Sequence, residues 1–257
     1  MSLSTTVTLA GGVELPRVGL GTWQLSGRRG YDAIRYALQA GYRHIDTATV
    51  YGNEAEVGRA VRESGLPREN IFVTTKLPPE RAGRARETLQ ASLRALDVAA
   101  VDLWLIHWPP RLKDIVNTWQ QMLAARTDGL ARAIGVSNFS TAQLDRLIDE
   151  TGEAPALNQL PWSPFQHNPK RMAEHRERGI VLEGYSPFKR SDLRSDTLSS
   201  IAAAHGVTPA QIVLRWHLQH DIVVIPKSAT PERISTNLDV YGFNLTDEEM
   251  SRIDSLS

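Results

Sequence analysis

Short apolar runs rich in β-branched residues alternate with segments of helical periodicity along almost the whole of this 257-residue chain. Between two such runs, for example, Leu89, Leu93 and Leu96 recur at i, i+4 and i+7 and share one helix face. The runs that we interpret as strands are Arg17–Leu20, Arg43–Asp46, Ile71–Lys76, Val101–His107, Ala131–Val136, Ala156–Leu160, Ile180–Gly184 and Ile222–Ile225. Strand–helix alternation predicts a parallel sheet, and about eight units over this length favour a closed (β/α)8 barrel, the TIM barrel, over a doubly wound sheet.

The N-terminal segment and the lack of linkers complete the predicted architecture. Residues Thr6–Leu9 and Val13–Leu15 flank Gly11-Gly12 and have the pattern of a β-hairpin, which we expect to plug the bottom of the barrel. No linker, low-complexity tract or shift in composition divides the chain, so residues 1–257 are predicted to form a single domain. Three helix starts are marked by capping boxes, namely Ser140 with Gln143, Thr208 with Gln211, and Thr246 with Glu249.

The composition excludes several classes of function. Lys+Arg and Asp+Glu are equal in number, 29 each, so no electrostatic argument predicts a nucleic-acid or anionic-membrane partner. The chain has no cysteine, which excludes disulfides, thiolate metal sites and a cysteine nucleophile. The N-terminus lacks the basic and apolar regions of a secretory signal, and no apolar run approaches the roughly 20 residues of a membrane helix. We therefore expect a soluble, cytoplasmic protein.

Two short patterns could suggest ligand sites that we do not predict. The segment from Gly19 to Gln24 begins like a dinucleotide-binding fingerprint, but Gln24 stands where the third glycine belongs. We interpret this segment as a tight turn after the first strand, so a nicotinamide cofactor would not be bound by a Rossmann fold. His217 and His220 could share a helix face and bind a metal, but two imidazoles are too few for a closed site. Both are predicted to be solvated helix residues, and no metal site is expected.

Polar residues of unusual kind end three of the predicted strands. Asp46, Lys76 and His107 each come at the end of an otherwise mostly apolar run. In a barrel, the carboxyl ends of all strands open onto the same face, which is where catalysis occurs. These three side chains are therefore expected to converge, and Tyr51, a few residues beyond Asp46, can reach the same rim.

Such a group suits the protonation of an oxygen that gains negative charge, as in carbonyl reduction. A tyrosine has an ordinary pKa of about 10, which is too high for efficient proton donation at neutral pH. The Lys76 ammonium is expected to lower the pKa of Tyr51, while the Asp46 carboxylate keeps Lys76 charged and in place. His107 would donate a hydrogen bond to a carbonyl oxygen and orient it.

The motifs around these residues resemble those of the aldo-keto reductase superfamily, in family order and over nearly the whole chain. They are Asp46-Thr-Ala-Thr-Val-Tyr51-Gly-Asn-Glu, Lys76, His107-Trp108-Pro109, Gly135-Val-Ser-Asn-Phe139, Asn158-Gln159, Gly184-Tyr-Ser-Pro187 and Ile225-Pro-Lys-Ser228. The chain most resembles the bacterial branch that includes the 2,5-diketo-gluconate reductases and related aldehyde reductases. This resemblance implies a catalytic tetrad of Asp46, Tyr51, Lys76 and His107. In it, Tyr51 would be the general acid in carbonyl reduction and the base in alcohol oxidation.

The resemblance also implies that the cofactor is NADPH/NADP+. The implied cofactor-binding residues are Thr22, Asp46, Ser137, Asn138, Gln159, Tyr185, Ser186, Lys227, Ser228, Arg233 and Asn237. Among them, Ser137, Asn138 and Gln159 match the residues that hold the nicotinamide carboxamide, and Tyr185 matches the ring that stacks on the nicotinamide. Ser186 lies where the family contacts the pyrophosphate, and the last four residues match the segment that binds the 2′-phosphate and adenine.

The substrate pocket is where the chain departs most from the family pattern. The implied substrate-binding residues are Trp23, Tyr51, His107 and Trp108, of which the two tryptophans match aromatic walls of the pocket. Residues 160–164 read Leu-Pro-Trp-Ser-Pro, where the family usually carries Glu and then His-Pro. The stretch after His107 is short, and the long C-terminal substrate loop of many relatives is missing. We therefore expect an open barrel mouth and broad specificity.

These observations predict an NADPH-dependent carbonyl reductase that acts on a small molecule as a monomer. Two alternatives from other classes remain open at this point. One is a redox-sensing binding subunit that serves as a channel partner, although this compact chain lacks the extensions that such a role favours. The other is a cofactor-free isomerase or aldolase in which Lys76 forms a Schiff base. The physiological substrate also stays open among sugar-derived ketones, methylglyoxal and aromatic aldehydes.

Overall fold

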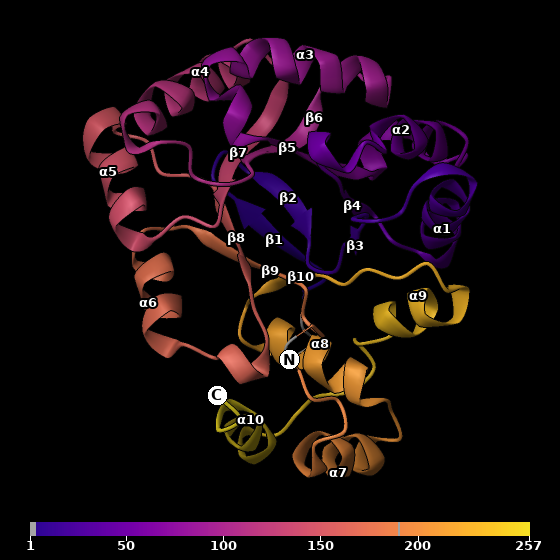
Figure 1. The fold of residues 1–257 in the computed structure, drawn as a ribbon. Helices are drawn as coiled ribbons and strands as arrows, with labels where there is room; N and C mark the ends of the chain where they lie inside the picture. The colour runs from indigo at the N-terminus through magenta and orange to yellow at the C-terminus, as the bar shows by residue number, and fades with distance from the viewer. Residues whose placement is uncertain (1–3, 190) are drawn as a thin grey trace.

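Parallel strands form a nearly closed barrel in the computed structural model, which describes residues 4–189 and 191–257 (Figure 1). In order around the ring, these eight strands of the described chain are β3 (Leu20–Gly21), β4 (His44–Asp46), β5 (Phe72–Leu77), β6 (Val101–Ile106), β7 (Ala131–Ser137), β8 (Leu157–Pro161), β9 (Val181–Tyr185) and β10 (Val223–Ile225). The ring closes where Val18 pairs with Val224 and the Gly19 amide donates a hydrogen bond to the Val224 carbonyl. The predicted (β/α)8 barrel is confirmed.

Each predicted strand corresponds to one barrel strand, and the first differs most. The sequence predicts a strand over Arg17–Leu20, whereas β3 comprises Leu20–Gly21 and is preceded by the single bridge at Val18. The partner β10 has only three residues, Val223–Ile225, so it offers few backbone groups for pairing with the segment before β3. The other strands begin and end within one residue or so of their predicted bounds.

Helices surround the barrel on its outer face (Figure 1). Those in the described chain are α1 (Gly27–Ala40), α2 (Glu54–Arg62), α3 (Ala85–Leu96), α4 (Ile115–Thr127), α5 (Thr141–Thr151), α6 (Pro169–Glu177), α7 (Asp196–His205), α8 (Pro209–Gln219), α9 (Pro231–Leu238) and α10 (Asp247–Asp254). Short 3-10 turns are η1 (Thr49–Tyr51), η2 (Arg68–Asn70), η3 (Pro79–Arg84), η4 (Leu112–Asp114) and η5 (Pro164–Gln166). The capping boxes predicted for α5, α8 and α10 are all present, because each N-cap hydroxyl accepts a hydrogen bond from the N3 amide.

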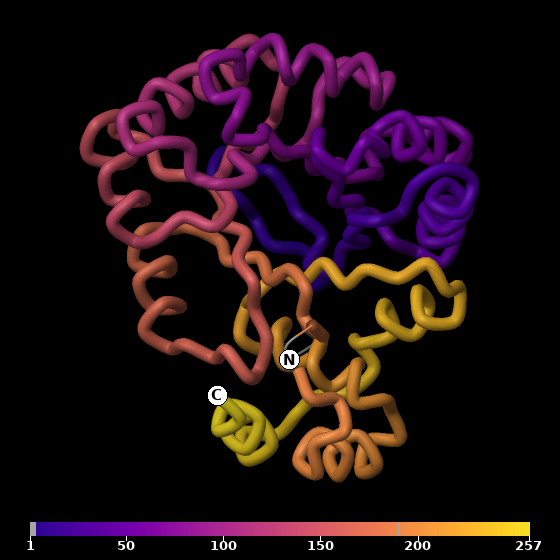
Figure 2. Tube along the Cα trace, in the orientation of Figure 1, coloured from indigo at the N-terminus to yellow at the C-terminus, as the bar shows by residue number. Residues whose placement is uncertain are grey.

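Two clusters of buried side chains fill the space between the barrel and its helices. The larger one lies beneath α1–α5 and includes Trp104 of β6 and Trp119 of α4. The smaller one joins β8 and β9 to α7, α8 and α10, with Trp162 and Trp216 among its members. Helices α7 and α10 accordingly lie outside α8 rather than directly on the barrel (Figure 2). No helix in the described part of the chain is long and apolar enough to cross a membrane.

The predicted N-terminal hairpin is present and closes one end of the barrel. Strands β1 (Thr6–Leu9) and β2 (Val13–Pro16) pair antiparallel, and the hairpin crosses the ring (Figure 2). Its buried residues Leu9, Val13 and Leu15 belong to a cluster with Phe72, Leu157 and Val223, which are the first residues of β5, β8 and β10. The hairpin therefore covers the amino-terminal end of the barrel.

The predicted tight turn after the first strand is present, since the Leu25 amide donates a 2.9 Å hydrogen bond to the Thr22 carbonyl just after β3. The two glycines before this turn serve close packing. A Cβ atom on Gly19 would lie 2.5 Å from Nδ1 of His44, and one on Gly21 would lie 3.0 Å from the Ile225 carbonyl oxygen. Neither glycine has a positive φ, whereas Gln24 does, at 61°. The first two glycines thus let β3 approach its neighbours closely at the point where the barrel closes.

The prediction that His217 is a solvated helix residue is wrong. His217 is fully buried on α8, with its Nδ1 2.7 Å from the Val213 carbonyl and its Nε2 3.3 Å from the Trp162 carbonyl. Burial lowers the pKa of His217 to about 4, although the hydrogen bonds to the two carbonyls act to raise it. The ring fits because Gly184 of β9 has no side chain, since a Cβ there would lie 3.0 Å from the imidazole. His220 lies at the end of the same helix and is half-buried.

Candidate active site

A cavity of about 410 Å³ opens at the carboxyl end of the barrel. Its lining residues are Gly21, Thr22, Trp23, Asp46, Val50, Tyr51, His107, Trp108, Ser137, Asn138, Gln159, Tyr185, Ser186, Lys189, Ile225 and Lys227. They come from the ends of most of the barrel strands and from the loops that follow them. The volume falls in the range of about 300–1,000 Å³ that is usual for small-molecule sites.

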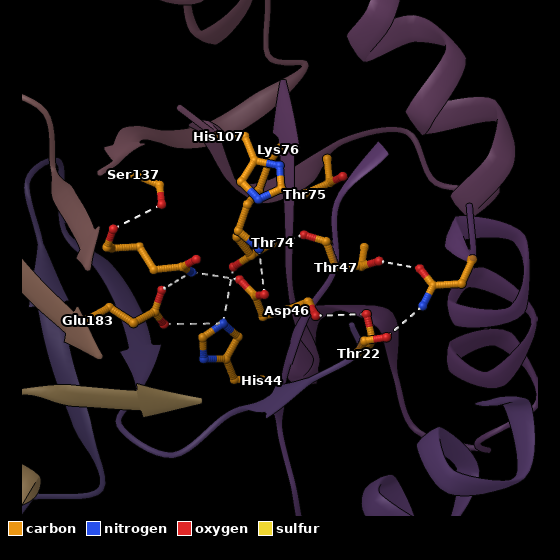
Figure 3. Close-up of polar contacts among 12 residues, drawn as sticks. Thr22, His44, Asp46, Thr47, Thr74, Thr75, Lys76, His107, Ser137 and Glu183 are labelled. Atoms are coloured by element: carbon orange, nitrogen blue, oxygen red, sulfur yellow. Dashed lines mark hydrogen bonds and ion pairs between the residues drawn. The ribbon is translucent and has the colours of Figure 1, made fainter. Parts of the chain in front are cut away.

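Three of the four residues expected to form the catalytic group, Asp46, Tyr51 and His107, line this cavity, and the fourth, Lys76, lies buried against Asp46. Asp46 ends β4, Lys76 lies one residue before the end of β5, His107 follows β6, and Tyr51 ends η1. Figure 3 shows Asp46, Lys76 and His107 close together. The Nζ atom of Lys76 lies 2.5 Å from Oδ1 of Asp46 and 5.3 Å from the centroid of the Tyr51 ring. The rings of Tyr51 and His107 meet edge to face, with their centroids 5.7 Å apart.

Lys76 and Asp46 form an ion pair that is shielded from water. Lys76 is fully buried and Asp46 is 2% exposed, and Nζ of Lys76 also donates a hydrogen bond of 2.8 Å to the Thr47 carbonyl. Burial alone would lower the pKa of Lys76, but the charges of Asp46 and Tyr51 outweigh it and the pKa is raised. Burial raises the pKa of Asp46, while Lys76 and Gln159 act in the opposite direction. The lysine therefore remains an ammonium beneath Tyr51.

The expectation that Lys76 would bring the pKa of Tyr51 below its ordinary value is wrong. Burial raises the pKa of Tyr51 and outweighs the lowering by Lys76, with a further increase from the Asp46 carboxylate. The phenol is thus held in its protonated form in the free protein. Lys76 still favours the phenolate, so its effect is felt when the phenol gives up its proton.

His107 is neutral at physiological pH. Burial lowers the pKa of His107 to about 3, and the nearby Lys76 ammonium lowers it further. A neutral imidazole carries one N–H group and can donate a single hydrogen bond. The backbone carbonyl of His107 accepts a 3.1 Å hydrogen bond from Nδ2 of Asn138, which ties this residue to the next part of the site.

Amide and hydroxyl groups also line the cavity. Nδ2 of Asn138 also donates to Oγ of Ser137 at 2.9 Å, and the Tyr185 hydroxyl donates to Oδ1 of Asn138 at 2.9 Å. Nε2 of Gln159 donates to Asp46 at 2.9 Å. Thr22 lies beside Asp46 on the other flank, and its hydroxyl donates to the Asp46 carbonyl at 2.9 Å. Direct hydrogen bonds thus connect three of the predicted cofactor-binding residues, Thr22, Asn138 and Gln159, to the predicted catalytic group.

Two of these residues have strained backbone conformations. Asn138 and Ser186 have φ values of 64° and 54°, in the left-handed region that residues with a side chain rarely adopt. Each follows directly on the last residue of a barrel strand, β7 for Asn138 and β9 for Ser186. Such strain persists only where the surroundings enforce it, and it is concentrated at ligand sites.

The residues expected at the far end of the cofactor lie in and before α9. Lys227 is exposed and lines the cavity, whereas Ser228, Arg233 and Asn237 do not line it. Ser228 and Asn237 are buried, and Oγ of Ser228 accepts a hydrogen bond from the Thr230 amide at 3.0 Å. Within residues 4–189 and 191–257, neither Lys227 nor the exposed Arg233 has an ion pair or side-chain hydrogen bond.

The outer wall of the cavity is aromatic and open. Trp23 and Trp108, both expected to bind substrate, are each 50% exposed. Val50 and Lys189 also line the cavity, although no sequence pattern predicted them to. The ammonium of Lys189 lies 6.0 Å from the Trp23 ring centroid, so these two side chains reach toward each other across the mouth.

A second buried acid, Glu183, lies beneath the catalytic group and was not predicted from the sequence (Figure 3). Its Oε2 accepts a 2.6 Å hydrogen bond from Nε2 of Gln159, and its Oε1 lies 3.9 Å from Nε2 of His44. Burial and the Asp46 carboxylate raise the pKa of Glu183 to about 8, so its carboxyl group is protonated at neutral pH. Burial also lowers the pKa of His44, to about 3. The signal that could have revealed both residues is a charged or titratable side chain inside an apolar strand.

Comparisons with known proteins agree with this architecture and site. The sequence model described as the Aldo/keto reductase family matches residues 17–257. An aldo-keto reductase of Mycolicibacterium smegmatis is 44% identical, with 99% of this chain and 94% of the relative covered. The 2,5-diketo-D-gluconic acid reductase B of a Corynebacterium species is also 44% identical (98% and 92% covered). Methylglyoxal reductase DkgA of Salmonella typhimurium is 41% identical (100% and 94% covered).

Solved structures show the same relationship in three dimensions. The crystal structure of an aldo/keto reductase from Brucella melitensis superimposes with a TM-score of 0.96 at 41% identity, covering 100% of both chains. A Bombyx mori aldo-keto reductase solved in complex with NADP superimposes with a TM-score of 0.93 at 34% identity, covering 100% of this chain and 94% of that one. On this evidence the chain belongs to the aldo/keto reductase family, whose members are oxidoreductases that act on carbonyl groups.

Proposed function

We propose that this protein reduces aldehydes and ketones to alcohols with NADPH, and that Tyr51 is the general acid. The observation that carries the proposal is the arrangement at the cavity floor. A protonated tyrosine lies beside a neutral histidine, His107, and above a buried lysine–aspartate pair. This arrangement supplies a proton, a hydrogen-bond donor and a positive charge around a single point, where a carbonyl oxygen becomes an alkoxide during reduction.

The cavity residues fit a nicotinamide dinucleotide. Ser137, Asn138 and Gln159 present hydroxyl and amide groups that can pair with a carboxamide, and Tyr185 supplies an aromatic ring beside them. Lys227 and Arg233 are cations without an ion-pair partner in the described chain, as expected of side chains that pair with the phosphate groups of a cofactor. When bound, NADPH supplies the hydride that adds to the carbonyl carbon.

Residues of the chain donate the proton in reduction and accept it in the reverse reaction. The Tyr51 hydroxyl donates its proton to the substrate oxygen, and Lys76 stabilises the phenolate that remains. His107, being neutral, donates its one N–H to the same oxygen and orients the carbonyl group. In the reverse direction the Tyr51 phenolate accepts the proton of an alcohol.

A Schiff-base role for Lys76 is not supported by its surroundings. An amine nucleophile must be neutral and accessible, and such lysines usually have a lowered pKa. Lys76 is fully buried, is paired with Asp46 at 2.5 Å, and has a raised pKa. Its ammonium is suited to stabilising the Tyr51 phenolate and not to attacking a carbonyl carbon.

We propose small carbonyl compounds as the substrate class, because the mouth is open and half-exposed tryptophans form its wall. Two relatives are named for the reduction of methylglyoxal and of 2,5-diketo-D-gluconic acid, which are small carbonyl compounds. We also propose that residues 1–257 act as a single domain and as a monomer, which size-exclusion chromatography with light scattering would test.

The proposed function is tested by replacing Tyr51 with phenylalanine. Tyr51→Phe keeps the ring but removes the proton, so reduction should fall by about 10²–10⁴-fold, the range typical of general acid catalysis. Tyr241→Phe, outside the cavity, is the matched control and should keep wild-type turnover. NADPH binding, followed by protein fluorescence, should be unchanged in both variants. A Tyr51→Phe enzyme that retains more than about a tenth of the wild-type single-turnover rate would refute the assignment.

A further inference from the structure

Two histidines and an aspartate from three separate segments converge outside the catalytic cavity. His167 follows η5, His220 follows α8, and Asp254 is the last residue of α10. One nitrogen or oxygen atom from each side chain lies within 4.8 Å of the other two. Nε2 of His220 is 2.8 Å and Nε2 of His167 is 3.7 Å from the same atom, Oδ1 of Asp254. We call these three residues the His167 cluster.

His167 is the member whose bonding is incomplete. Its side chain is 7% exposed, and in the described chain neither of its ring nitrogens has a hydrogen-bond partner. The 3.7 Å that separates its Nε2 from Asp254 is too long for a hydrogen bond. Buried polar groups in proteins are normally paired, so an imidazole that points at a carboxylate across this gap calls for a bridging group.

The surroundings hold the three side chains in place. The indole nitrogen of Trp216 donates a 2.7 Å hydrogen bond to Oδ1 of Asp254. The rings of His167 and His220 stack with centroids 5.0 Å apart, and the Trp216 ring packs edge-on against each of them. Outer hydrogen bonds of this kind orient the ligands of metal ions.

We propose that His167, His220 and Asp254 bind a divalent transition-metal ion of the zinc type. Two imidazole nitrogens and one carboxylate oxygen suit Zn²⁺, whereas Ca²⁺ and Mg²⁺ require mostly oxygen ligands. Donors in a tetrahedral zinc site lie about 3.3 Å apart, so modest side-chain rotations from the observed positions complete the coordination. Asp254 is 29% exposed and His220 17%, which leaves a solvent-facing position for water as the fourth ligand.

The ion would join parts of the chain that are far apart in sequence. It would tie the end of α10 to α8 and to the loop between η5 and α6. A ligand that binds only the folded chain raises its stability by mass action. None of the three residues lines the catalytic cavity, so this site is independent of the proposed reductase function.

The test uses the full chain without an affinity tag, because a histidine tag would itself bind metal. The protein is first treated with EDTA, which is then removed. Isothermal titration calorimetry measures the binding of ZnCl2, and thermal unfolding measures the effect of zinc on stability. We expect a single Zn²⁺ per chain and a higher Tm with zinc than with EDTA. With CoCl2 in place of zinc, a four-coordinate site gives intense visible absorption bands, which report the coordination directly in the wild-type chain.

Conservative variants identify the ligands. His167→Gln, His220→Gln and Asp254→Asn should each weaken zinc binding at least tenfold and abolish the cobalt bands. The control is His205→Gln, which removes a histidine paired with Glu249 at 2.9 Å but without a third ligand, and it should bind zinc like the wild type. No heat of binding and no cobalt spectrum in the wild-type chain would overturn the proposal. Equal affinity in the wild type and Asp254→Asn would overturn it as well.

Discussion

Replacing Lys76 with methionine removes the positive charge beneath Tyr51 while keeping most of the side chain's volume. At the 5.3 Å between Nζ and the Tyr51 ring centroid, and with an effective dielectric constant of about 20, one unit charge contributes about 3 kcal/mol. That energy corresponds to about two pKa units, or roughly a hundredfold in rate if the phenolate is fully formed in the transition state. We therefore expect Lys76→Met to slow reduction about a hundredfold.

The same substitution also destabilises the fold, because it leaves Asp46 buried without its partner. Asp46 is 2% exposed, and removal of one member of a buried ion pair typically costs about 3–5 kcal/mol. The double variant Lys76→Met/Asp46→Asn removes both charges and should recover most of the lost free energy of unfolding. It should not recover activity, because the charge that stabilises the Tyr51 phenolate is still missing.

Two measurements separate these effects. Urea unfolding gives the stability of the wild type, the single variant and the double variant. Single-turnover oxidation of NADPH with a small aldehyde gives the rate of the chemical step, and the pH dependence of alcohol oxidation should show the pKa of Tyr51 shifted upward. A double variant that is stable and also within about threefold of the wild-type rate would refute the reasoning, since it would make the ion pair purely structural.

Three further perturbations test other parts of the structure. Gly58→Ala should destabilise the fold by about 1–3 kcal/mol or more in urea unfolding, since its Cβ would lie 2.2 Å from the Leu96 carbonyl oxygen. The control Gly83→Ala, with open space at its Cβ, should be near neutral. The pKa of Glu183 is raised from 4.5 to about 8, so between these pH values the folded chain holds a proton that the unfolded chain releases. As the pH rises through this window, the free energy of unfolding of the wild type should therefore fall relative to that of Glu183→Gln, by at most about 1.4 kcal/mol per pH unit. A difference in unfolding free energy that stays constant from pH 5 to pH 8, a range that lies within this window, would contradict the raised pKa of that carboxyl group. Arg233→Ala should raise the KM for NADPH about tenfold or more and leave that for NADH unchanged, because one charge-assisted contact to the 2′-phosphate is worth about 1.5–3 kcal/mol. Equal losses with both cofactors would mean that Arg233 does not bind that phosphate.

The fold and much of the site could be predicted from the sequence because they depend on local patterns and on one general property of barrels. Strands and helices have different periodicities of apolar residues, and a hydroxyl followed by Gln or Glu three residues later marks a helix start. The carboxyl ends of parallel strands share one face, so Asp46, Lys76 and His107 could be placed together although they are distant in sequence.

The role of Glu183 depends on neighbours that no local pattern identifies. It stands inside an apolar strand, and its partner Gln159 is 24 residues away on the adjacent strand. Only the register between β8 and β9, in which Gln159 pairs with Glu183, brings the two side chains together. The His167 cluster likewise unites the residues that follow η5 and α8 with the last residue of α10, whereas helical periodicity alone suggested the pair His217 and His220.

The sequence by itself determined which titratable groups meet at the carboxyl end of the barrel, and the tertiary structure decided their protonation. The proximity of Lys76 to Tyr51 was predictable, and so was the direction in which its charge acts on the tyrosine's pKa. The net direction was not, because burial of Tyr51 raises its pKa by more than Lys76 lowers it. Burial is produced by side chains from many strands and loops that exclude water together, so its contribution exists only once the whole barrel has formed.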